Sequence, residues 1–190
     1  MKAEDKIYQA FFELKENKLY YNQLKERTEL SHSSLQNAIN KLTNLNILKQ
    51  EKTKSNTFYI ILNKKLLSLK FSEIAIKQFN NLNIRIKNPL RNFLKNISQE
   101  VYTVVLFGSA SRGEEQKDSD IDLLIVMNRE IDLSNNKKDA EITSKYPISI
   151  FQATIEQFLK NEDDMIIQAR KTGFPIYKEQ NFYEAIFDEY

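Results

Sequence analysis

Hydrophobic residues recur every three or four positions through the first 44 residues, which is the spacing of amphipathic helices. The first predicted helix covers residues 3–16 and has one apolar face (Ile7, Ala10, Phe11, Leu14). A short helix is predicted from Asn22, as N-cap, to Arg27. A third is predicted over Ser33–Asn44, with Ser31 as N-cap and a second apolar face (Leu35, Ala38, Ile39, Leu42).

Two β-rich segments come directly after these helices. Ile47–Lys52 and Thr57–Leu62 are predicted strands, and the polar turn Glu51–Asn56 joins them into a hairpin. Helix, short helix, helix and hairpin in this order resemble a winged helix-turn-helix, and the resemblance covers about residues 3–62.

The resemblance implies that the third helix enters the major groove of duplex DNA. Its outward residues are then the candidate base and phosphate contacts: Ser33, Ser34, Gln36, Asn37, Asn40 and Lys41. Lys52 and Lys54 in the wing are expected to reach backbone phosphates. Winged helices also mediate protein contacts, so a docking module with a polar face remains the alternative.

Apolar residues at helical spacing continue through residues 63–100. Asn63 is a possible N-cap for one helix, and Asn88 with Pro89 predicts the start of a second, because proline is favoured at the first helical position. We expect a winged helix at 1–65, a helical connector at 66–98 and a further domain at 99–190.

Two apolar runs frame a polar loop in that last domain. Val101–Phe107 predicts a buried strand, Gly108-Ser109 a tight turn, and Leu123–Met127 a second strand that opens with Asp120-Ile121-Asp122. Residues two apart in a strand point to the same face, so the two aspartates present their carboxylates together. Such a pair suits a hard cation, Mg²⁺ or Mn²⁺.

The remaining pattern completes an α+β fold in α/β layers. A helical crossover is predicted over Leu133–Lys145, a third strand over Ile148–Phe151, and a capping box from Thr154 to Gln157 opens a short helix. A further helix, Glu162–Lys171, is expected to end at Gly173 in the C′ position.

The loop between the first two strands has features of a phosphate site. Gly108 lets the backbone approach a ligand closely, and Ser109 offers a hydroxyl and an N–H at the start of a short helix. A phosphate cradle that faces a carboxylate pair implies phosphoryl or nucleotidyl transfer. The alternative is a surface loop with a solvated acidic cluster.

The motif G-S-x-x-R-G followed by S-D-x-D resembles nucleotidyltransferases of the DNA polymerase β type, and more narrowly the minimal nucleotidyltransferase domains of prokaryotes. The resemblance covers Phe107–Val126 closely. It implies a mixed sheet flanked by helices, nucleoside triphosphate bound by Gly108, Ser109, Ser111 and Arg112, and catalytic divalent metals bound by Asp120 and Asp122. Family members usually have alanine where this chain has Ser111.

One feature of that family is missing. Its active members have a third carboxylate on the strand after the crossover, but Pro147–Gln152 contains no Asp or Glu. Ser149 or Gln152 takes that place, and Glu141 and Glu156 are near in sequence but not at the family's position. This departure puts catalysis in question without affecting nucleotide or metal binding.

The charge is distributed unevenly. Residues 1–65 hold 12 Lys/Arg and 7 Asp/Glu, net +5, whereas residues 99–190 hold 10 and 18, net −8. A basic half joined to an acidic half indicates a polyanion-binding module on a different functional domain. The chain has no Cys and no apolar run of membrane-spanning length, so we expect no membrane association and a cytoplasmic location.

Three functions are compatible with these features. The first is an enzyme that transfers an NMP group from a nucleoside triphosphate to a hydroxyl on a protein or other acceptor. The second is a DNA-binding transcriptional regulator whose degenerate nucleotidyltransferase domain senses nucleotides. The third, suggested by the resemblance alone, is an antitoxin that partners a small helical toxin-like protein.

Overall fold

The computed structural model describes residues 1–54, 56–114, 116 and 119–187. It divides into two compact units, Met1–Ile74 and Ala75–Tyr190. The boundary falls within helix α4 (Lys64–Asn81), inside the segment predicted as a connector. Each unit is described separately below.

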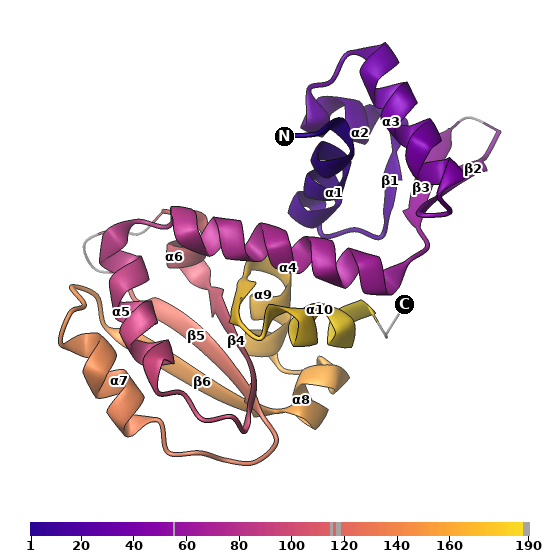
Figure 1. The fold of residues 1–190 in the computed structure, drawn as a ribbon. Helices are drawn as coiled ribbons and strands as arrows, with labels where there is room; N and C mark the ends of the chain where they lie inside the picture. The colour runs from indigo at the N-terminus through magenta and orange to yellow at the C-terminus, as the bar shows by residue number, and fades with distance from the viewer. Residues whose placement is uncertain (55, 115, 117–118, 188–190) are drawn as a thin grey trace. The chain divides into compact units, whose positions relative to one another are not determined.

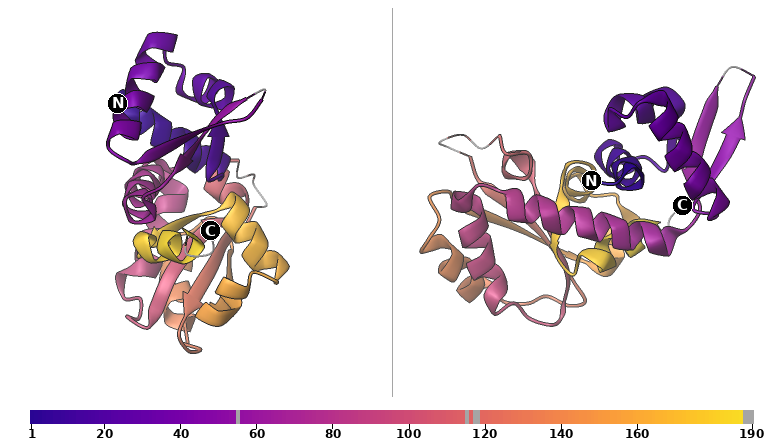
Figure 2. Two further views of the ribbon diagram at one scale, coloured as in Figure 1. Left: turned by 90° about the vertical axis from the view of Figure 1, so that its right-hand side faces the viewer. Right: turned by 45° about the horizontal axis from the view of Figure 1, so that its top comes forward.

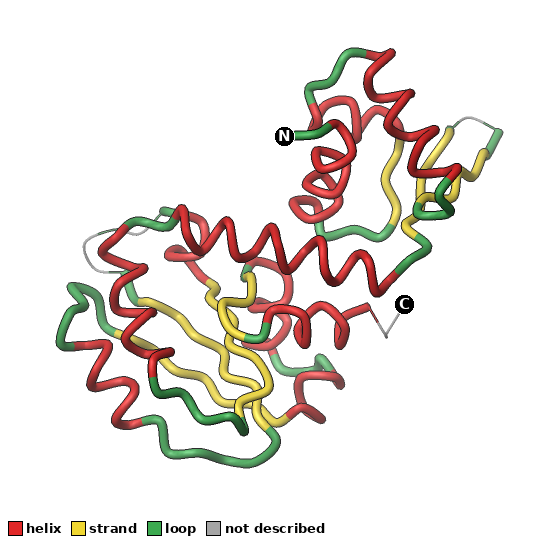
Figure 3. Tube along the Cα trace, viewed as in Figure 1, coloured by secondary structure: helices red, strands yellow, loops and turns green. Residues whose placement is uncertain are grey.

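The first unit contains three helices and a small antiparallel sheet, seen together in Figure 3. Its elements are α1 (Ala3–Leu14), β1 (Lys18–Tyr20), α2 (Tyr21–Thr28), α3 (His32–Asn44), β2 (Leu48–Lys52) and β3 (Thr57–Ile61). The strand order is β1-β3-β2. The three predicted helices and the predicted hairpin are therefore present, and the hairpin register runs from Leu48 opposite Ile61 to Lys52 opposite Thr57.

The predicted apolar faces form the core of this unit. Fully buried side chains come from all three helices, and they include Ile7, Phe11, Leu24, Leu35 and Ile39. The hydroxyl of Ser31 accepts a hydrogen bond from the Ser34 amide at 3.2 Å and caps α3 as predicted.

The start of α2 was predicted wrongly. Its N-cap is Tyr20 rather than Asn22, and the Gln23 side chain accepts a hydrogen bond from the Tyr20 amide at 2.8 Å. The preceding residues form β1, which pairs with β3 and which the sequence pattern did not indicate. A three-residue strand is too short to show alternation, so its pairing depends on β3.

The helical segment after the hairpin also differs from prediction. Helix α5 (Ile84–Lys95) begins upstream of Pro89, because the Asn83 side chain accepts a hydrogen bond from the Arg85 amide at 3.0 Å and caps the helix there. The predicted start at Asn88-Pro89 is therefore wrong. Proline lies within the second turn, where it removes one intrahelical N–H donor.

A four-stranded mixed sheet forms the centre of the second unit. Its strands are β4 (Val101–Phe107), β5 (Ile121–Met127), β6 (Ile148–Thr154) and β7 (Phe174–Tyr177), in the order β6-β5-β4-β7. β5 and β6 are parallel, whereas β4 is antiparallel to both β5 and β7. The expected α+β class with a mixed sheet is confirmed.

Helices cover both faces of this sheet, as Figures 1 and 2 show. Besides α5, they are α6 (Gly108–Arg112), α7 (Ser134–Glu141), α8 (Ile155–Lys160), α9 (Asp164–Thr172) and α10 (Glu179–Phe187). Helices α5 and α7 pack together on one face, and α9 lies on the other. The capping box of Thr154 and Gln157 opens α8 as predicted. Within the described residues, no helix combines the length and apolar character needed to cross a lipid bilayer.

Gly173 ends α9, but not in the left-handed conformation typical of C′ glycines, because its backbone is extended. A Cβ at this position would lie 2.6 Å from the carbonyl oxygens of both Ala169 and Leu106. Glycine is required here because the end of α9 and the end of β4 approach too closely for any side chain.

Candidate functional site

The polar loop and the acidic pair lie at the same end of the sheet. Phe107, the last residue of β4, is paired with Asp122 near the start of β5. Gly108 follows Phe107 and begins α6. The antiparallel pairing of β4 with β5 therefore brings the predicted phosphate loop against the predicted metal ligands.

Gly108 makes this approach possible. Its φ is +72°, in the left-handed region, and a Cβ built on it would lie 2.2 Å from Oδ2 of Asp122. The Asp122 carboxylate therefore occupies the space that a side chain at position 108 would fill. This contact explains the glycine at the start of the motif.

We expect Gly108→Ala to lower the free energy of unfolding by about 3 kcal/mol, because it adds backbone strain and displaces the Asp122 carboxylate. Urea denaturation would measure the loss. Gly113→Ala is a matched control, since Gly113 has a φ of +68° but no atom of the described residues lies within 4 Å of the position that an added Cβ would take. The control should lose about 1 kcal/mol, and equal losses in the two variants would show that the Asp122 contact is unimportant.

Two further loop residues hold the backbone of Gly108. The buried Ser111 hydroxyl donates to the carbonyls of Gly108 and Thr172, at 2.8 and 3.3 Å. Arg112 donates from Nη1 to the Gly108 carbonyl at 3.0 Å, and its Nε binds Glu114 at 2.6 Å. Both side chains thus brace the loop, whereas Ser109 is half-buried within α6.

The two aspartates differ in environment. Asp120 is exposed and precedes β5, whereas Asp122 is half-buried within it. Burial raises the pKa of the Asp122 carboxyl, and the negative charge of Asp120 raises that pKa further. A bound cation would offset both effects by supplying positive charge between the carboxylates.

Ser149, on β6, lies at the acidic pair. It lies beside Asp122 in the parallel β5–β6 register, and its hydroxyl donates to Oδ2 of Asp120 at 3.0 Å. Gln152 lies beside Ile125 instead, and its side chain donates to the Ile131 carbonyl. Of the two residues that the sequence left open, Ser149 is therefore the one at the acidic pair.

The two glutamates that lie near the missing third carboxylate in sequence form ion pairs with lysines. Glu141 pairs with Lys137 at 3.7 Å, and Glu156 pairs with Lys160 at 2.8 Å. Among the residues that the structure describes, no group of three His, Cys, Asp or Glu side chains could hold a metal ion. Two carboxylates and a hydroxyl still fit a hard cation whose remaining ligands are waters and substrate phosphates.

The residues predicted to face DNA lie on the surface of the first unit. Most are exposed along α3 and in the β2–β3 hairpin: Ser33, Ser34, Asn37, Asn40, Lys41, Lys52 and Lys54. Gln36 is half-buried and donates to Asn40 at 3.0 Å. Lys41 forms a salt bridge with Glu4 of α1, so binding a phosphate would require it to leave that partner.

Two features of these sites were not found from the sequence. The Thr172 carbonyl braces the loop through Ser111, and a backbone acceptor leaves no residue-type signal. On the first unit, the hydroxyl of Tyr21 and Nδ1 of His32 form an exposed hydrogen bond of 2.7 Å between α2 and α3. Only the pairing of their helices brings these two residues together.

Comparison with known proteins agrees with this geometry. Residues 87–177 match the family model described as "Nucleotidyltransferase domain". The matched segment runs from α5 to the end of β7 and includes Gly108, Asp120, Asp122 and Ser149. No curated protein and no solved structure matches the chain significantly.

The segment 87–177, just under half of the chain, is therefore similar to a nucleotidyltransferase domain. The matched segment lies within the second unit. Domains of this family generally use a nucleoside triphosphate and a divalent metal ion.

Proposed function

We propose that the second unit binds a nucleoside triphosphate with Mg²⁺ and transfers its NMP group to a hydroxyl acceptor. The observation that carries this proposal is the contact of the Gly108 backbone with the Asp122 carboxylate. The predicted phosphate loop lies directly beside the two candidate metal ligands, which supports this proposal. Ser109 and the α6 amides are the candidate phosphate contacts, and Asp120 and Asp122 the candidate metal ligands.

The proposed reaction forms one bond and breaks one. The acceptor oxygen bonds to the α-phosphorus, the bond from that phosphorus to the pyrophosphate oxygen breaks, and the acceptor proton passes to a base or to solvent. The divalent cation supplies positive charge that offsets the negative charge of the phosphates. The protein's own role is to orient the triphosphate through the braced loop and to hold the two carboxylates in place.

The Ser149–Asp120 hydrogen bond favours a second candidate function. A neutral hydroxyl supplies neither the charge nor the proton acceptor of a third carboxylate, so we expect intrinsic transfer to be slow. A site that binds Mg-NTP without rapid turnover could act as a nucleotide sensor. Calorimetric titration with ATP and GTP in Mg²⁺ tests binding, and transfer assays with all four triphosphates then separate enzyme from sensor.

We also propose that the first unit is a DNA-binding winged helix-turn-helix. The order of its helices and its β1-β3-β2 sheet support this proposal, as do the exposed polar face of α3 and the exposed wing lysines. The net charge of +5 over residues 1–65 favours a polyanionic partner. Duplex DNA is then the nucleic acid that α3 would read through its major groove.

We expect the double variant Lys52→Ala/Lys54→Ala to weaken DNA binding equally for all sequences. The slope of log K against log salt concentration is negative, and each lost phosphate contact should reduce its magnitude by about 0.9. Fluorescence anisotropy with a labelled duplex at several salt concentrations measures that slope.

Lys49→Ala is the matched control for this experiment. Lys49 belongs to the same strand as Lys52 but is paired with Glu51 at 2.7 Å. It should leave the slope unchanged. An unchanged slope in the double variant would show that the wing lysines make no phosphate contacts.

A further inference from the structure

The outer edge of β6 carries backbone groups without a strand partner. β6 is the edge strand of its sheet, and within the described part of the chain only β5 pairs with it. Its sequence, ISIFQAT, contains no charge, no proline and no glycine. Charges and proline are two of the features that keep edge strands from pairing, and the β6 sequence has neither.

The hydrogen-bond register shows which residues face outward. The Pro147 carbonyl accepts from the Ile121 amide at 2.8 Å, and alternate residues in a parallel ladder direct both backbone groups to the same neighbour. Ser149, Phe151 and Ala153 therefore face β5. Ile148, Ile150 and Gln152 direct their N–H and C=O groups to the open edge.

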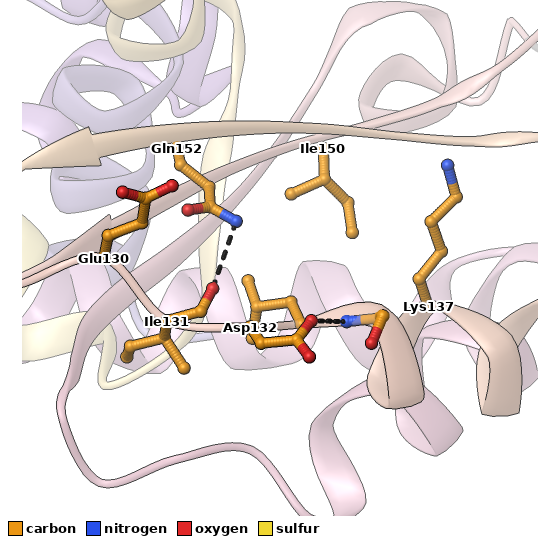
Figure 4. Close-up of a pocket in the computed structure, with 8 residues that line it drawn as sticks. Glu130, Ile131, Asp132, Lys137, Ile150 and Gln152 are labelled. Carbon is orange, nitrogen blue, oxygen red and sulfur yellow. Dashed lines mark hydrogen bonds between the residues drawn. The ribbon is translucent and has the colours of Figure 1, made fainter.

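Cavities lie on both sides of this edge. The larger has a volume of about 570 Å³ and lies on the α7 face, where Ile150 and Gln152 form its upper wall in Figure 4. The second, of about 310 Å³, lies on the α9 face and includes Phe151 and Ile166. Side chains of an added strand would alternate between these two cavities, because successive residues of a strand point to opposite faces.

The charged residues that line the two cavities indicate which kind of segment the β6 edge would bind. The α7-side cavity is lined by Glu130 and Asp132, with Lys137 as its single basic residue, and Asp163 lines the α9-side cavity. Lys137 already pairs with Glu141. A second copy of β6 would bring its own acidic walls to the same place, so charge disfavours pairing between copies and favours a basic segment.

We propose that the β6 edge binds an extended basic segment of a partner protein by β-strand addition. The outward groups of Ile150 and Gln152 hydrogen-bond to the added backbone. Basic side chains of the segment approach Glu130 and Asp132, and its apolar side chains contact Phe151 and Ile166. This proposal is independent of whether the nucleotide site is catalytic.

A labelled seven-residue peptide of alternating lysine and valine is a direct probe. We expect it to bind in fluorescence anisotropy and to protect the Ile150 and Gln152 amides from hydrogen exchange. Ser149 and Phe151 amides, which face β5, should change little. The same peptide with every amide N-methylated should bind at least tenfold more weakly, because it cannot donate backbone hydrogen bonds.

Protein variants separate strand addition from simple attraction of charges. Gln152→Pro removes an outward N–H without removing a donor to β5, so it should weaken peptide binding at least tenfold. Gln152→Ala keeps that N–H and should bind like the parent. Glu130→Lys should weaken binding, whereas Glu162→Lys, an exposed residue outside both cavities, should not.

Three results would overturn the proposal. One is no binding of the peptide at millimolar concentration. Another is peptide binding that neither N-methylation of the peptide nor Gln152→Pro weakens, which would mean that the peptide binds by ionic attraction alone. The third is a dimer in sedimentation analysis that Gln152→Pro converts to monomer, since a second copy would then occupy the edge.

Discussion

Ser149→Asp is expected to raise the rate of nucleotidyl transfer about 100-fold, the lower end of what a positioned acid–base group contributes. The new carboxylate would lie beside Asp122 in the sheet, where the Ser149 hydroxyl now binds Asp120. It would supply both a third metal ligand and a proton acceptor. Release of pyrophosphate with Mg²⁺ and each triphosphate, in the presence of candidate acceptors, measures the rate.

Ser149→Asn is the matched control, because asparagine has the size of aspartate without its charge. Both variants lose the serine hydroxyl, but only aspartate adds a carboxylate. Ser149→Asn should therefore leave the rate of transfer at the parent level. An equal gain in the two variants would show that loss of the Ser149–Asp120 hydrogen bond, rather than a new carboxylate, activates the site. No gain with aspartate would favour the nucleotide-sensor function.

The double variant Asp120→Asn/Asp122→Asn is expected to lose Mg²⁺-dependent nucleotide binding by about 100-fold or more. Changes to residues that only support metal ligands already cost roughly 10–100-fold in affinity, and this variant removes both proposed ligands. Calorimetric titration of ATP and GTP with Mg²⁺ gives the affinities of parent and variant. Equal nucleotide affinities in parent and variant would show that Asp120 and Asp122 do not take part in nucleotide binding.

The same variant should be at least as stable as the parent when no metal is present. The folded state raises the pKa of Asp122 above its unfolded value, so ionisation of this carboxyl opposes folding. The parent should therefore lose stability as pH rises through that pKa, and the variant should lose less. Thermal unfolding in EDTA at several pH values checks this sign and also shows that lost binding does not reflect lost folding.

The strands with apolar runs and the helices with a clear apolar face were predictable from the sequence. Strands β4 and β5 each contain an apolar run of at least four residues, and α1 and α3 have clear apolar faces, so their existence followed from pattern alone. β1 and the true start of α5 were not predictable, because each depends on a tertiary pairing or on a competing cap. Asn83 caps α5 upstream of a proline that locally indicates a later start.

The candidate site was predictable in its residue types but not in its geometry. Glycine, serine and two aspartates at motif spacing indicated a phosphate loop near a cation site. The contact of Gly108 with Asp122 requires the antiparallel pairing of β4 with β5. The choice of Ser149 over Gln152 requires the register of β5 with β6, which periodicity does not specify.

The hydrogen bond from Ser111 to the Thr172 carbonyl affects the order in which the candidate nucleotide site forms. Ser111 reaches the Thr172 carbonyl, 61 positions later in the chain, and Gly173 sets the close approach of that segment to Leu106. A growing chain that already contains the glycine and the two aspartates of the motif therefore still lacks the Thr172 and Gly173 contacts that support its loop. The full support of the loop therefore forms only after α9 has been synthesised and packed. We expect a ribosome-bound chain ending before residue 172 to bind a nucleotide more weakly than the full chain.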